Sequence, residues 1–195
     1  MHIDHVIYAT SDLDEAARRI EAELGLRSVE GGRHEGLGTH NRIVPLGAGY
    51  LELMAVVDSE QGASSELAGL LQARIAAAKE GLLGWCVAVD DIEAVAARLG
   101  TPITPIKREG LSARLTGLAE ALREPFLPFF ISRDPGVPDP GAAGAAGGIS
   151  WIEVVGDAGR LETWLGNSKL PVRIVGGAPA VRAMGIGRRV LRADS

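Results

Sequence analysis

Three ionisable side chains stand inside runs of apolar residues, where a charge is costly to bury without a partner. His5 lies in the run I-D-H-V-I-Y-A, Glu52 in Y-L-E-L-M-A-V-V and Glu153 in S-W-I-E-V-V. Imidazole and carboxylate groups are common carriers of protons in enzymes. We predict that His5, Glu52 and Glu153 face one pocket and are its catalytic groups.

Other polar and aromatic side chains accompany these three. His34 and His40 belong to the glycine-rich segment G-G-R-H-E-G-L-G-T-H-N, which ends at Asn41 and predicts a tight loop beside the pocket. We predict a substrate-binding set of His34, His40, Asn41, Tyr50 and Trp151, in which the two aromatic rings could stack on a planar substrate. Other interpretations stay open. The two histidines could be ordinary surface residues, the asparagine could satisfy backbone groups, and the two aromatic rings could only form the wall and core of the pocket.

The elements that must position these side chains repeat once along the chain. An apolar strand, I-D-H-V-I-Y-A, leads to a helix that Asp12 can cap, and a second strand, G-W-C-V-A-V, leads to a helix that Asp91 can cap. When the two halves are aligned at their helix caps, Gly84 occupies the position in the second half that His5 occupies in the first. Cys86 is expected to share the inward face with Gly84 and to be an inert packing residue, because nothing near it in sequence would lower its pKa.

The resemblance between the halves continues downstream. Further strands are predicted at residues 41–46, 50–57, 126–132 and 150–155. Glu52 and Glu153 then hold equivalent places, and each half is β-α-β-β-β in outline. The sequence therefore predicts an α+β fold of two tandem βαβββ modules whose mixed sheets form a cup-shaped cleft.

Several segments fall outside the repeat. Residues 64–80 predict a joining helix, residues 115–123 suit a helix or a half-buried strand, and the Pro- and Gly-rich residues 134–148 predict a mobile loop. Two short strands are expected after residue 165, at 172–175 and 181–184. We predict a domain over residues 1–166, with modules at about 1–60 and 82–157, and a C-terminal extension over 167–195 that packs on it.

Composition narrows the function classes. The formal net charge of -5 gives no basic footprint for nucleic acid, and the single cysteine excludes an internal disulfide and a Cys-based zinc site. No apolar run is long enough to span a membrane. We expect a cytoplasmic protein that binds a small molecule, without a nucleic-acid or membrane partner, as a monomer or a homodimer.

At this point the sequence resembles a known family. His5, the helix opening at Asp12, Glu52 and Glu153 are similar to the pattern of the vicinal oxygen chelate superfamily. More narrowly, the segment from Gly31 to Asn41 and the run Y-L-E-L resemble the subgroup called glyoxalase-like domains, as do L-P-F-F-I and W-I-E. The likeness covers roughly residues 3–166.

The resemblance implies a site as well as a fold. In the superfamily, metal ligands come from four positions, which correspond here to His5, Glu52, Gly84 and Glu153. A divalent ion held there leaves positions open for two oxygens of a substrate and acts as a Lewis acid. Because Gly84 offers no ligand, the expected metal set is His5, Glu52 and Glu153, with His34, His40 or water as the candidates to complete it. A metal-free cup is the other interpretation.

Two functions of different class follow. The first is a lyase, isomerase or dioxygenase that acts on a small oxygen-rich molecule, in which Glu52 or Glu153 moves a proton. The second is a non-enzymatic protein that sequesters a drug or metabolite, in which Tyr50 and Trp151 do the binding. A cup that serves a partner protein is a third option.

Overall fold

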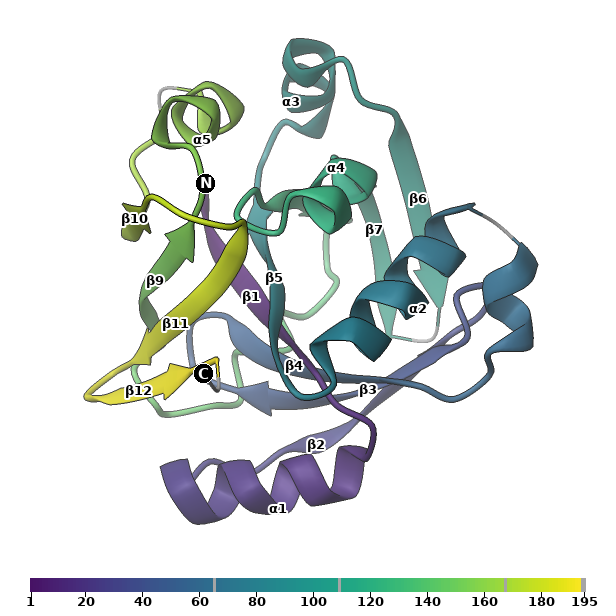
Figure 1. Ribbon diagram of the computed structural model, residues 1–195, viewed down its shortest axis with the longest axis vertical. Helices are drawn as coiled ribbons and strands as arrows, with labels where there is room; N and C mark the ends of the chain where they lie inside the picture. Colours follow the sequence, from purple (N-terminus) through teal and green to yellow (C-terminus); the bar gives the residue numbers. More distant parts are fainter. Residues whose placement is uncertain (65, 109, 167, 194–195) are drawn as a thin grey trace.

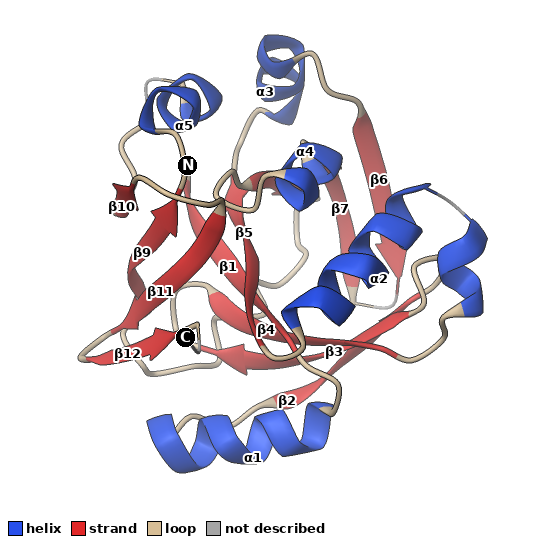
Figure 2. Cartoon of the chain, in the orientation of Figure 1, coloured by secondary structure: helices blue, strands red, loops and turns tan. Residues whose placement is uncertain are grey.

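Two β-sheets organise the chain in a computed structural model, which describes residues 1–64, 66–108, 110–166 and 168–193 (Figures 1 and 2). The large sheet has eight strands in the order β2-β3-β4-β1-β5-β8-β7-β6, and the small sheet has four in the order β10-β9-β11-β12. The strands of the large sheet are β1 (His2–Ala9), β2 (Val29–His34), β3 (Thr39–Pro45), β4 (Tyr50–Val56), β5 (Gly81–Ala88), β6 (Ile103–Arg108), β7 (Leu111–Thr116) and β8 (Phe129–Arg133). Those of the small sheet are β9 (Ile149–Val155), β10 (Val172–Val175), β11 (Ala180–Ile186) and β12 (Arg189–Arg192).

The large sheet consists of two β-α-β-β-β modules, which confirms the predicted fold class. The first contains β1, helix α1 (Leu13–Leu24), β2, β3 and β4. The second contains β5, helix α3 (Ile92–Leu99), β6, β7 and β8, with helix α4 (Leu118–Arg123) inserted before β8. In each module the last strand pairs in parallel with the first, and β1 and β5 pair antiparallel at the centre of the sheet.

The place of β9 differs from the sequence interpretation. The run S-W-I-E-V-V was matched to the last strand of the second module, but that strand is β8, and β9 begins the small sheet. The run F-F-I-S-R of β8 is buried along nearly its whole length and carries no carboxylate, so it shows no likeness to Y-L-E-L. The division of the chain near residue 166 stays a prediction, although β10, β11 and β12 join β9 in one sheet.

The joining segment forms two helices, η1 (Glu60–Ser64) and α2 (Glu66–Ala78), while Ser65 lies outside the described residues. The ambiguous residues 115–123 divide between the end of β7 and α4. A last helix, α5 (Ala158–Leu165), follows β9 and is capped by Asp157, whose side chain accepts from the backbone N–H of Arg160. No helix among the described residues combines the length and the apolar character needed to cross a bilayer.

Strand alternation sorts the apolar residues into two cores. Val6 and Tyr8 of β1 point to the outer core, which α1, α3, α5 and the small sheet close. Ile7 and Ala9 point to the inner, concave face of the large sheet, where α2 and α4 cover it. Figure 1 shows α2 lying across this curled sheet. The inner face of β1 and β4 also carries buried polar side chains, among them His5 and Glu52, which apolar packing does not explain.

Candidate functional site

A β-bulge in β1 turns two neighbouring polar residues toward the inner face. Ile3 pairs with Val87 and His5 pairs with Cys86, so Asp4 is an extra residue with no partner on β5. Such a bulge breaks the strict alternation of side chains. Asp4 and His5 are both buried, with exposures of 1% and 3%, and their side chains contact each other.

His5 is held on every side. Its Nδ1 lies 2.6 Å from Oδ1 of Asp4, and its Nε2 lies 3.4 Å from Oε2 of Glu52. The ring stacks on Tyr50 with centroids 4.6 Å apart, and Phe129 meets it edge-on at 5.4 Å. These contacts fix both the plane of the imidazole and the direction in which Nε2 points.

Glu52 occupies the centre of the group and is 6% exposed. Its Oε1 accepts a hydrogen bond from Nδ2 of Asn41 and lies 3.7 Å from Nε2 of His34. Nδ1 of His34 is in turn 2.8 Å from Oγ1 of Thr39. Glu52 thus stands between two imidazoles, one facing each of its oxygens. Of the predicted residues, the structure brings together His5, Glu52, His34, Asn41 and Tyr50.

Asp4 and Arg133 form an ion pair that the sequence did not reveal. Nη2 of Arg133 lies 2.9 Å from Oδ1 of Asp4, Nη1 contacts Oδ2, and the same guanidinium reaches the Tyr50 hydroxyl at 3.5 Å. Burial alone would raise the pKa of Asp4, but the hydrogen bonds from Arg133 and His5 outweigh it and hold that pKa well below its usual range. Burial, with Glu52 and Asp4 nearby, raises the pKa of Tyr50 well above its ordinary value.

The register of the two modules shows which positions are equivalent. His5 of β1 pairs with Cys86 of β5, and Ile7 pairs with Gly84. A pseudo-twofold axis between the two strands therefore makes His5 equivalent to Gly84 and Ile7 equivalent to Cys86. Glu52 pairs with Ile7, and Phe129 pairs with Cys86, so Glu52 and Phe129 are equivalent.

The bulges obey the same symmetry. The second register shift, between Ile7 and Tyr8, leaves Leu83 as the extra residue on β5, which makes Leu83 the counterpart of Asp4. Asp4, His5 and Glu52 of the first module therefore correspond to Leu83, Gly84 and Phe129 of the second. The carboxylates and imidazoles of the cluster come from the first module, and the second module contributes the guanidinium of Arg133 at the end of β8.

Comparison with known proteins identifies the family of this fold. A family model described as a glyoxalase-like domain matches residues 3–167. The chain belongs to the glyoxalase-like domain family. This confirms the resemblance to the vicinal oxygen chelate superfamily that the sequence indicated. Functionally curated proteins yield no match to this sequence.

Solved structures share the fold of this glyoxalase-like protein at low sequence identity. A hypothetical protein from Staphylococcus aureus has 17% identity and a TM-score of 0.67, with 92% of this chain and 88% of that chain covered. Streptomyces coelicolor methylmalonyl-CoA epimerase, in complex with 2-nitronate-propionyl-CoA, has 18% identity and a TM-score of 0.52, covering 68% of this chain and 96% of that chain. A methylmalonyl-CoA epimerase in complex with methylmalonyl-CoA and NH4+ has 19% identity and a TM-score of 0.51, covering 71% and 98%.

Three predicted residues of the glyoxalase-like protein lie apart from this cluster. Glu153 is in β9 of the small sheet, where Oε1 faces Nε of Arg182 at 3.5 Å. Trp151, on the same strand, packs under the guanidinium of Arg173, 4.3 Å from the ring centroid. His40 points from β3 toward Glu30, with 3.1 Å between Nε2 and Oε1. The predicted set of His5, Glu52 and Glu153 is not assembled in one place.

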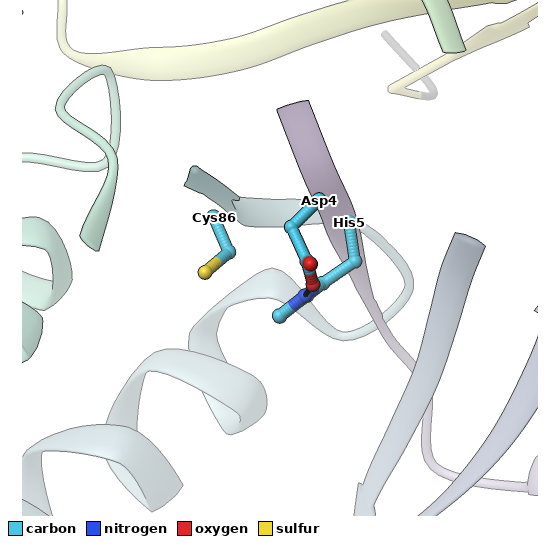
Figure 3. A group of neighbouring side chains, drawn as sticks. All are labelled: Asp4, His5 and Cys86. Carbon is cyan, nitrogen blue, oxygen red and sulfur yellow. Dashed lines mark hydrogen bonds and ion pairs between the residues drawn. The ribbon is translucent and has the colours of Figure 1, made fainter. Parts of the chain in front are cut away.

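The four metal positions of the superfamily do not fit this chain. Gly84 and Phe129 occupy the two positions from the second module, and neither offers a ligand atom. Among the described residues, the donors that converge most closely are Asp4, His5 and Cys86, whose ligand atoms lie within 4.8 Å of one another (Figure 3). Both oxygens of Asp4 already bind Arg133, however, and burial raises the pKa of the Cys86 thiol, whereas a metal needs the thiolate. This group is better described as a packed ion pair beside an inert thiol.

Packing explains why the glycine-rich segment needs a glycine at one of its turn positions, and this explanation can be tested. Gly38 (φ +68°) and Gly36 (φ +77°) both adopt the left-handed conformation, but a Cβ on Gly38 would lie 2.0 Å from the carbonyl oxygen of Asp58, whereas one on Gly36 would meet nothing. We expect Gly36→Ala to cost about 1–2 kcal/mol of unfolding free energy from the backbone alone. Gly38→Ala should cost about 1–3 kcal/mol more, because the clash involves backbone. Urea unfolding of both variants measures the difference, and equal losses would contradict the packing argument.

Proposed function

We propose that this protein binds a small oxygen-rich molecule beside Glu52 and moves a proton on a carbon next to its carbonyl group, as an isomerase or lyase does. The observation that carries the proposal is the buried pair of His5 and Glu52, whose Nε2 and Oε2 lie 3.4 Å apart. The relatives whose printed ligands are CoA esters support the reaction type by analogy of fold alone.

The protonation states follow from the contacts. Because Asp4 is ionised, Nδ1 of His5 carries the proton that the 2.6 Å hydrogen bond requires. A neutral His5 would then turn the lone pair of Nε2 toward the carboxylate of Glu52, which is repulsive. One further proton, on Nε2 or on Oε2, relieves this repulsion. The geometry thus allows one proton between Nε2 and Oε2, 3.4 Å apart.

A proton held in this way suits reversible exchange with a substrate. An ionised Glu52 can take a proton from an acidic C–H, and the same carboxyl can return it to the other face or to a neighbouring atom. Asn41, which is fully buried, keeps Oε1 in place while Oε2 faces His5. His34 and Arg133, with side chains 15% and 13% exposed, are the most exposed members of the cluster and stand at its two ends, beside Glu52 and Asp4 respectively.

Proton transfer can be detected without knowing the natural substrate. The protein is incubated in D2O with a panel of 2-hydroxy acids, 2-oxo acids and acyl thioesters, and loss of the C–H signal is followed by proton NMR. The expected result is exchange in one of these classes well above the protein-free rate. Absence of exchange in every class, in protein shown to be folded, would contradict the proposal.

The apolar inner face of the second module favours one alternative, a protein that binds an apolar molecule without converting it. Phe129 of that module meets the ring of His5 edge-on, and Leu83 belongs to the same inner apolar core. A compound that raises the unfolding temperature strongly, remains chemically intact and shows no exchange would support this function. Three predictions from the sequence are independent of these experiments. They are a cytoplasmic location, a monomeric or homodimeric state, and lyase or dioxygenase specificity.

A further inference from the structure

We propose that a cavity at the carboxyl end of α2 binds a small monocarboxylic acid, whose carboxylate pairs with Lys79. The cavity has a volume of about 520 Å³, and its walls come from the ends of β1, β4 and α2. Pockets that hold small molecules have volumes of roughly 300–1,000 Å³ and combine apolar walls with a few polar groups. The site is separate from the pair of His5 and Glu52, and it does not depend on the proposed proton transfer.

Lys79 follows α2 in a backbone conformation that normally belongs to glycine. Its φ is +54°, and within the described part of the chain every other residue with a positive φ is a glycine. Helices α1 and α3 end in the same left-handed conformation at Gly25 and Gly100, where φ is +63° and +67°. A side chain makes this conformation unfavourable, and such strain persists mainly at ligand sites and active sites. The charge of Lys79 also suits the carboxyl end of a helix, but that role needs no strained backbone.

Two hydrogen-bond donors of the cavity are available to a ligand. The ammonium of Lys79 and the hydroxyl of Ser11 make no ion pair or hydrogen bond with another described residue, and both residues are exposed. The other two polar residues are already engaged. Oγ1 of Thr10 lies 3.0 Å from Oε1 of Glu80, and Nη1 of Arg19 lies 2.6 Å from Oε2. A ligand that enters the cavity therefore meets Lys79 and Ser11 as its free partners.

The charges around the cavity favour a ligand with a single negative charge. Arg19 offsets the charge of Glu80 through their ion pair, so Lys79 leaves a net positive charge. A dianion such as phosphate would be repelled by the Glu80 carboxylate, whereas a monocarboxylate is satisfied by one cation and one hydroxyl. The rest of the ligand would lie against an apolar wall made by Val56, Ile75 and Ala76. A short-chain carboxylic acid combines these properties.

The cavity lies along the inner face of β4 at a distance from Glu52. Glu52, Met54 and Val56 share one face of the strand, so Val56 stands about 13 Å further along it. Met54, which lies between them, is packed in the inner apolar core. A short-chain acid bound at Lys79 therefore does not reach the pair of His5 and Glu52.

Sodium hexanoate is the probe that tests this site. It is added to full-length, isotope-labelled protein while the backbone amide signals are followed by NMR, and hexanamide serves as an uncharged ligand of the same shape. We expect saturable shifts at Thr10, Ser11 and Ala76, with a Kd of about 1 mM or lower. Hexanamide should bind roughly fivefold more weakly or worse, because it lacks the charge that Lys79 recognises.

Two substitutions of Lys79 separate binding from folding. Lys79→Gln should weaken hexanoate by roughly fivefold or more, because it removes the cation. The matched control is Lys107→Gln, which removes the same charge from an exposed residue of β6 and should change the Kd by less than about twofold. Lys79→Gly should raise the unfolding temperature, because glycine relieves the backbone strain, and should weaken hexanoate as much as Lys79→Gln does.

Three results would overturn the site. They are the absence of saturable hexanoate binding, a Kd for Lys79→Gln equal to that of wild type, and shifts that gather around Arg133 and His5 instead of the end of α2. Inorganic phosphate that binds more tightly than hexanoate would reject the ligand class.

Discussion

Replacing Arg133 by methionine is expected to lower the free energy of unfolding by about 3–5 kcal/mol at pH 7, because it strands the Asp4 carboxylate without its cation. Asp4 is 1% exposed, and Arg133 contacts both of its oxygens. Urea unfolding with a common slope measures the loss. Methionine keeps most of the volume, so a cavity contributes little.

A surface ion pair provides the control for this variant. Arg160 binds Glu124 with both Nε and Nη2, yet its side chain is 47% exposed. Arg160→Met should therefore cost less than about 1 kcal/mol. The double variant Asp4→Asn/Arg133→Met should recover part of the loss, since it removes the stranded charge. A loss from Arg133→Met no larger than that from Arg160→Met would show that the buried pair does not stabilise the fold.

The pH dependence of stability follows from the same carboxylate. Its folded-state pKa is depressed, so its contribution is fully present above the ordinary carboxyl value of about 3.9 and is lost as pH falls through that value toward the folded-state pKa. We expect the stability gap between wild type and Asp4→Asn to be constant from about pH 7 to pH 5 and to narrow below about pH 4. Unfolding curves at these pH values test this, and a gap that widens on acidification would reverse the assigned sign.

Alternation in two strands was enough to predict part of the site. The period of two in a strand puts His5, Ile7 and Ala9 on one face of β1, and Ile7 and Ala9 line the inner core. The same period puts Glu52 between Tyr50 and Met54 on one face of β4, and all three side chains are buried. These strands alternate regularly in the part that carries the site, so period alone gave the direction of each side chain.

Long-range geometry explains what the sequence could not show. Asp4 follows from a bulge, and strand alternation places it on the wrong face, away from His5. Arg133 lies 129 positions from its partner, at the end of a strand whose apolar run gives no sign of an ion pair. The sequence matches β9 to β4 because W-I-E-V resembles Y-L-E-L in composition. Strand pairing decides which strands are equivalent, and it is β8 that pairs with β5 in the large sheet.

The unequal modules connect these observations. Both halves keep the bulge at the same position, so the backbone that would support a symmetric site is present twice. Only the first half fills it with ionisable groups, and Leu83 and Phe129 of the second half belong to the inner apolar core. An apolar wall on one side of a carboxylate lowers the local dielectric and strengthens every electrostatic contact on the other side. If the proposed proton transfer holds, the second module contributes to it through this apolar wall, which meets the ring of His5 at Phe129.

The decisive comparison for function is between Glu52→Gln and Glu153→Gln, two carboxylates that the sequence treated as equals. Glutamine keeps the size of either side chain and removes its ability to carry a proton. We expect Glu52→Gln to slow D2O exchange by about 10²–10⁴-fold, the usual contribution of a positioned acid or base. Glu153, which faces Arg182 from the small sheet, should change the rate by less than about twofold when substituted.

The stability of Glu52→Gln separates a loss of chemistry from a loss of structure. Glutamine can still accept from Asn41 through its amide oxygen, and its amide NH2 can donate to Nε2 of His5 in place of the shared proton. The variant should therefore unfold within about 1 kcal/mol of wild type. Equal exchange rates in wild type and Glu52→Gln, or an equal slowing by Glu153→Gln, would move the chemistry away from the cluster that His5 and Glu52 form.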